Sequence, residues 1–169
     1  KVEENPDRAM IMDLRIHTPS SLAHMKVEGV DTAPALVRIA KVKRLDIIAI
    51  TDFHSGASID SVVRAAAEAN LKVIPGVTLR CSLPPCDDVT LIVLFPEHYS
   101  SQQVDQFLDN LNVPQERRGD SNYIINLPFN EVISLVEVHG GISIPTRLDR
   151  TPQQKQIIPK LVEEFGFKA

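Results

Sequence analysis

The sequence lacks most of the features that mark specialised protein classes. Only two of its 169 residues are cysteine, too few for a disulfide-stapled scaffold. The longest strongly apolar run is LIVLF at residues 91–95, far too short to cross a bilayer. Lys and Arg number 18 against 22 Asp and Glu, so the chain has no positive excess that would attract nucleic acid or an anionic membrane. The composition therefore predicts a globular domain without a membrane or nucleic-acid partner.

Several common catalytic motifs are also missing. Glycine occurs only seven times, and neither glycine-rich phosphate-loop pattern is present. The nucleophile elbow G-x-S-x-G is absent as well. Cys81 and Cys86 lie in the segment CSLPPC with no further zinc ligands nearby, so we expect two reduced thiols. The charged start KVEENPDRAM lacks the apolar core of a signal peptide, and we expect a cytoplasmic protein.

The hydrophobic pattern alternates between strands and helices. We expect strands at residues 11–16, 46–50, 71–77, 89–95 and 142–144, with Pro75-Gly76 breaking the third near its end. Amphipathic helices are expected between them, the last two ending near Gly140 and Gly166. Such alternation is typical of βαβ units around a parallel sheet. We interpret residues 1–169 as one domain, with an N-terminal extension at 1–10 and an irregular loop at 112–126.

Four segments resemble, in order, the motifs of the PHP (polymerase and histidinol phosphatase) family. They are DLRIHT at residues 13–18, LDIIAITD at 45–52, VIPGV at 73–77 and GGISIPTRLDR at 140–150. The resemblance implies an α/β fold, a distorted (β/α)7 barrel with parallel strands. Because α/β barrels usually need more than about 200 residues, we expect the barrel to be incomplete in this chain.

In that family, clustered His, Asp and Glu side chains hold two or three divalent metals that activate water against a phosphoester. This sequence departs from the pattern at five positions, one of which is Thr90, where relatives often have a fourth-strand histidine. Arg15 stands where the first motif has a histidine, and Phe53 follows Asp52 where the second has one. Thr78 replaces the glutamate of the third motif, and Arg147 replaces the histidine of the last.

The residues that remain as metal ligands by this resemblance are His17, Asp52, His54 and Asp149. His54 is displaced by one position, so it needs a bulge or turn to reach the site. Two guanidinium groups in the same pocket repel a cation and cannot lose a proton to become ligands. We therefore expect no resident cofactor, with Mn, Fe or Zn as the alternative.

Arg15 and Arg147 allow two interpretations. Both lie where the family's metal site would be, so they can bind a phosphate or carboxylate in place of the metal. Alternatively each forms an ion pair with a nearby acid: Asp13 or Asp52 for Arg15, and Asp149 for Arg147. The two interpretations differ in whether positive charge is left over for a ligand.

The sequence therefore favours a catalytically degenerate PHP-like domain, a pseudoenzyme with a binding, structural or regulatory role. Its expected partners are a phosphate-bearing small molecule or another protein. The alternative is an active metal-dependent phosphoesterase that hydrolyses phosphomonoesters or phosphodiesters with non-standard ligands. Stoichiometric metal and hydrolysis that EDTA abolishes would indicate that alternative.

Overall fold

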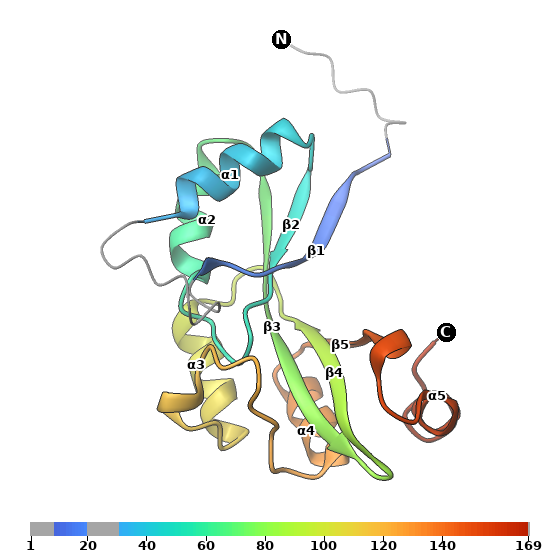
Figure 1. Ribbon diagram of the computed structural model, residues 1–169. Coiled ribbons are helices and arrows are strands. Elements are labelled where there is room, and N and C mark those ends of the chain that lie inside the picture. Colours follow the sequence, from blue (N-terminus) through green and yellow to red (C-terminus); the bar gives the residue numbers. More distant parts are fainter. Residues whose placement is uncertain (1–8, 20–30, 169) are drawn as a thin grey trace.

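The computed structural model describes residues 9–19 and 31–168. Its strands are β1 (Met12–Ile16), β2 (Ile47–Ile50), β3 (Lys72–Leu83), β4 (Cys86–Leu94) and β5 (Ile142–Thr146). Its helices are α1 (Ala33–Val42), α2 (Ile59–Ala67), α3 (Ser101–Asn110), α4 (Phe129–Val138) and α5 (Gln154–Phe165), with short 3-10 turns η2 (Gln115–Arg117) and η3 (Leu148–Arg150). The helices α1 and α2 lie beside β1 and β2, and α3 and α4 lie beside the half of the sheet that contains β4, β5 and the end of β3 (Figure 1).

The five strands form one mixed sheet in the order β1-β2-β3-β4-β5. β1, β2 and β3 are parallel, but β4 is antiparallel to β3 and β5 is antiparallel to β4. The prediction of an all-parallel sheet was therefore wrong. Only Pro84 and Pro85 separate β3 from β4, and so short a connection can join only antiparallel strands, because a parallel pair needs a crossover of a dozen or more residues.

The strand β3 does not break at Pro75-Gly76 as expected; it changes partner there. Residues 72–75 pair with β2, whereas β4 pairs with β3 from Gly76 onward. Proline has no N–H to donate, but the Pro75 carbonyl still accepts a hydrogen bond from the Phe95 N–H at 2.8 Å. Gly76 allows the close approach, since a Cβ there would lie 2.6 Å from the Val93 carbonyl oxygen.

Helix ends follow the expected signals. Gly140 and Gly166 adopt left-handed backbone with φ of +67° and +68°, and they follow α4 and α5. The third helix begins with a capping box, in which the Ser100 hydroxyl accepts from the Gln103 N–H and the Gln103 side chain accepts from the Ser100 N–H. These residues satisfy backbone groups at the helix ends that would otherwise lack partners.

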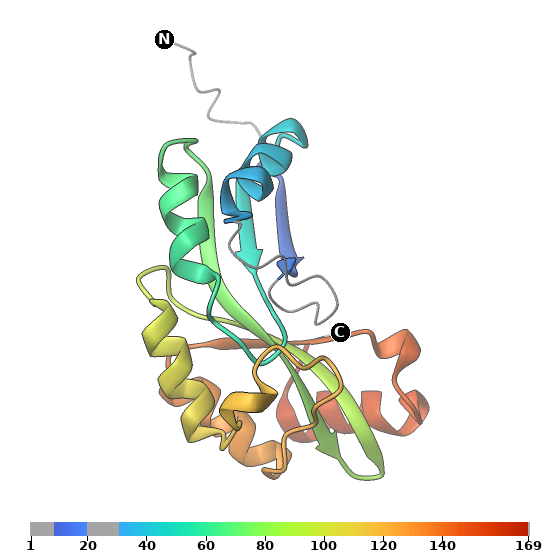
Figure 2. The same ribbon diagram turned by 60° about the vertical axis from the view of Figure 1, so that its left-hand side comes forward.

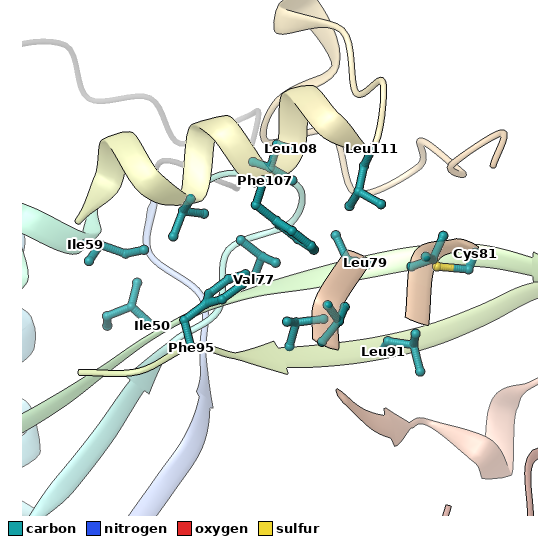
Figure 3. Close-up of a cluster of buried hydrophobic side chains, with 14 of the residues drawn as sticks. Ile50, Ile59, Val77, Leu79, Cys81, Leu91, Phe95, Phe107, Leu108 and Leu111 are labelled. Carbon is teal, nitrogen blue, oxygen red and sulfur yellow. The ribbon is translucent and has the colours of Figure 1, made fainter. Parts of the chain in front are cut away.

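The core lies between α3 and the half of the sheet that contains β4, β5 and the end of β3 (Figure 3). Phe107 and Leu108 of α3 are fully buried, as are Val77 and Leu79 of β3. Cys81 and Cys86 are free and buried, which confirms two reduced thiols, and burial raises the pKa of the Cys81 thiol to about 12. Such a thiol is a small core side chain rather than a nucleophile.

Two further segments complete the fold. Residues 112–126 contain η2 and a single bridge from Ile125 to Cys81, but no regular strand. Residues 1–8, most of the expected N-terminal extension, lie outside the described residues. Within the described ranges, no helix combines the length and the apolar character that a membrane span requires.

We expect Gly76→Ala to lower the free energy of unfolding by about 1–3 kcal/mol, because its Cβ would collide with the backbone of β4. Ser82→Ala, on the same strand, adds no atom and serves as the control. Urea unfolding followed by circular dichroism measures both variants. Equal stability of the two would contradict the importance of the close approach at Gly76.

Candidate strand-end site

Hydrogen bonds to Thr78 of β3 hold the segment that follows β2 in place. The Thr78 N–H donates to the Asp52 carbonyl, and the His54 N–H donates to the Thr78 carbonyl, both at 3.0 Å. The Thr78 hydroxyl donates to the Thr51 carbonyl at 2.8 Å. Thr78, which stands where the resemblance implies a glutamate, therefore holds backbone in place.

Asp52 joins the ends of β1 and β2. Its side chain is 1% exposed, and its two carboxylate oxygens accept from the Thr18 N–H at 2.5 Å and from the Thr18 hydroxyl at 2.6 Å. The Thr18 hydroxyl also lies 2.8 Å from the Ser58 hydroxyl at the start of α2. These contacts give Asp52 a structural role at the strand ends.

His17 lies flat against Phe53, with ring centroids 4.8 Å apart and an interplanar angle of 4°. Both ring nitrogens are buried, and neither forms a well-aligned hydrogen bond to a described residue. Burial lowers the pKa of His17, and the charges of Arg15 and Arg147 lower it further, while the nearby Thr51 backbone opposes them. The aromatic ring at position 53 thus packs on His17 instead of adding a second imidazole beside it.

The His54 side chain contacts Tyr123 instead of the other expected metal ligands. Its backbone is left-handed with φ of +46°, and its Nε2 lies 2.9 Å from the Tyr123 carbonyl oxygen. The ring meets Tyr123 edge-on at 5.4 Å and is completely buried. Burial lowers its pKa to about 4, so it is neutral at physiological pH.

The structure does not bring the four expected metal ligands together. Asp52 binds Thr18, His54 meets Tyr123, and the exposed Asp149 lies 3.7 Å from Arg150. Within residues 9–19 and 31–168, no group of three or more His, Cys, Asp or Glu side chains could hold a metal ion. The described side chains therefore do not fit the two- or three-metal centre that the resemblance implies.

The arginines, in contrast, share one electrostatic environment. Burial lowers the pKa of Arg15, and the positive charges of Arg147 and Arg150 lower it further, with partial opposition from Asp13. The Asp13 carboxylate accepts a hydrogen bond from the Arg15 backbone N–H at 3.0 Å. Since Arg15 lies on β1 and Arg147 follows β5, the sheet must curl to bring its two edge strands toward each other; these strands run at a steep angle (Figure 2).

The expected ion pairs are not formed among the described residues. The carboxylates of Asp13 and Asp52 bind Arg15 and Thr18 backbone N–H groups, and Asp149 approaches Arg150 instead of Arg147. The Arg15 Nε is buried and has no hydrogen-bond partner in the part of the chain that the structure describes. Positive charge therefore remains at this end of the sheet.

Two pockets adjoin these groups. One, of about 440 Å³, is lined by Phe53, Arg80, Asp88, Thr90, Ser121, Asn122, Arg147, Arg150 and Thr151. The other, of about 530 Å³, lies between β1 and α1 and includes Arg15 and His17 with several apolar side chains. No motif in the sequence marks Asp88, which enters the first pocket because β4 runs antiparallel to β3.

No protein-family model and no curated protein sequence matches the chain. Solved structures do. An amidohydrolase from Chromobacterium violaceum, with bound sulfate and no metal, superposes with a TM-score of 0.64 and 12% identity, over 92% of this chain and 73% of the other. A proposed metal-dependent phosphoesterase from Bifidobacterium adolescentis superposes with a TM-score of 0.60 and 17% identity, over 92% and 75%. At these identities the likeness shows the fold: an α/β sheet that matches part of a barrel.

We expect His54 to make stability depend on pH. Because its pKa is about 4 when folded and about 6.5 when unfolded, its contribution is complete above pH 6.5 and is lost as the pH falls toward 4. The loss between pH 7.5 and pH 5.0 is about 2 kcal/mol. Urea unfolding at the two pH values measures it, and His54→Gln should remove this part of the dependence. An unchanged pH dependence in the variant would contradict the assignment.

Proposed function

We propose that this chain is a PHP-like domain whose strand-end pocket binds a phosphate group through arginine side chains, and that it does not act as a metal-dependent hydrolase. One observation carries the proposal: burial and then the nearby positive charges of Arg147 and Arg150 lower the pKa of Arg15, while no described acid forms an ion pair with Arg15 or Arg147. A guanidinium group presents donors in a fixed fork that suits phosphate oxygens.

The surroundings support an anion better than a cation. A divalent metal at this place would face the positive charges of Arg15, Arg147 and Arg150, which the negative charge of Asp13 opposes only in part. An anion would instead relieve the repulsion between the arginines. The sulfate that accompanies the metal-free Chromobacterium violaceum structure is consistent with anion binding on such a fold.

Isothermal titration calorimetry with inorganic phosphate tests the proposal. We expect saturable binding by the wild-type chain and a loss of about 10-fold or more in affinity for Arg147→Ala, which removes a charge-assisted contact. Arg15→Ala should cause a smaller loss, because Arg15 lines the neighbouring pocket and attracts the anion through its charge. Arg64→Ala, an exposed arginine on α2, should bind as the wild type does. Absence of binding by the folded wild-type chain would refute the proposal.

Metal removal separates the proposal from a metal-dependent phosphoesterase. We expect EDTA treatment to leave phosphate affinity unchanged, because the described residues include no group of three or more side chains that could hold a metal ion. Added Mn, Fe or Zn should produce no hydrolysis of an aryl phosphate. Stoichiometric metal by elemental analysis, together with hydrolysis that EDTA abolishes, would favour the phosphoesterase instead.

A further inference from the structure

The pocket that contains Arg147 and Arg150 also contains a second polar cluster, around Arg80 and Asp88. The Arg80 Nε and Nη2 each donate to one Asp88 carboxylate oxygen at 2.8 Å. The Arg80 Nη1 donates to the Ser121 carbonyl at 2.7 Å. Three hydrogen bonds from one guanidinium fix both side chains of the pair in position.

The Arg80–Asp88 pair gives this pocket two sides that differ in net charge. The charge of Arg80 is balanced by Asp88, so Arg80 adds little attraction for an anion. Among the described residues, Arg147 and Arg150 on the other side of the pocket have no such close acidic partner; Arg150 has only the exposed 3.7 Å contact with Asp149, which is worth little in water. A ligand that carries a phosphate group would therefore place the phosphate near Arg147 and the rest of the molecule near Asp88.

The Asp88 side of the pocket is suited to hydroxyl groups. The Asp88 side chain is 32% exposed, and each of its oxygens has a lone pair left after Arg80 is bound. Thr90 lies opposite Arg80 in the register of β3 and β4, and the Asn122 side chain lines the same pocket. Phe53 supplies the only large apolar side chain among those that line this pocket in the described residues, and His17 already covers one of its faces.

We propose that the pocket binds a phosphorylated sugar or similar polyol, with the phosphate at Arg147 and Arg150 and the hydroxyls at Asp88 and Asn122. This inference rests on the proposed phosphate binding and adds the chemical class of the rest of the ligand. Arg80 acts as a positioning residue, because it holds the Asp88 carboxylate where hydroxyl groups can donate to it.

Calorimetry with four compounds tests the inference: inorganic phosphate, glucose 6-phosphate, glucose and phenyl phosphate. We expect glucose 6-phosphate to bind about 10-fold more tightly than inorganic phosphate, as one or two added hydrogen bonds would give. Phenyl phosphate should bind no better than inorganic phosphate, because the Asp88 side of the pocket offers its ring no apolar surface. Glucose alone should not bind measurably.

Variants at Asp88 and Asn122 test which side chains cause the preference for glucose 6-phosphate. Asp88→Asn should reduce the advantage of glucose 6-phosphate to about 3-fold or less, and inorganic phosphate should bind at least as tightly as before. Asn122→Ala, which leaves the Arg80–Asp88 pair intact, should also reduce the advantage and serves if Asp88→Asn does not fold. Asp87→Asn removes an equal charge at an exposed neighbouring position and should change nothing.

The outcomes separate the two proposals. Binding of inorganic phosphate without a preference for glucose 6-phosphate, or with a preference that survives in both site variants, overturns the sugar-phosphate inference alone. The inference is also overturned if phenyl phosphate binds as tightly as glucose 6-phosphate, or more tightly. If none of the phosphate compounds binds the folded wild-type chain, the proposed function fails as well.

Discussion

The arrangement of the site depends on one constraint, the close contact of two backbones at Gly76. There β3 leaves β2 and begins to pair with β4, and the Val93 carbonyl lies where a side chain would otherwise be. Since β2 ends at Ile50 while β3 continues to Leu83, the residues after β2 meet a strand instead of solvent. Thr78 then provides the backbone hydrogen bonds that hold Asp52 and His54 in place, so the partner change positions the residues that follow β2.

Within that frame, the side chains next to His17 determine what the site can bind. Phe53 covers one face of the imidazole at 4.8 Å, and Asp52 is engaged by Thr18. The polar groups left with capacity for a ligand are mainly guanidinium groups. Because a guanidinium keeps its proton throughout the physiological range, this charge is permanent and does not depend on pH as a histidine cluster would.

Much of the fold could be predicted because its signals are local. The buried run of β2, the capping box at Ser100 and the left-handed glycines 140 and 166 each depend on a few neighbouring residues. The direction of β4 could not be inferred from residues 71–77 and 89–95 alone, since a strand has the same alternating pattern in either direction. The extension of β3 and β4 toward Pro84-Pro85 leaves a connection too short for a crossover, and that length is the signal that indicates a hairpin.

The candidate site was less predictable because its contacts join distant segments. Arg15, Arg147 and His17 were identified from motif positions, but the Arg80–Asp88 pair depends on hairpin register. Likewise, the contact of His54 with the Tyr123 carbonyl spans 69 positions and requires left-handed backbone at a non-glycine residue. No periodicity in the sequence encodes such a contact.

The placement of the arginines links ligand binding to the integrity of the sheet. Arg15 lies on β1 and Arg147 directly follows β5, the two ends of the strand order. Their mutual repulsion therefore exists only when all five strands are in place, and it adds to the effect of burial in lowering the pKa of Arg15 in the folded chain. In the function proposed above, a phosphate group bound beside these arginines would offset this repulsion in the folded chain alone, so it would stabilise the fold in proportion to the logarithm of its concentration.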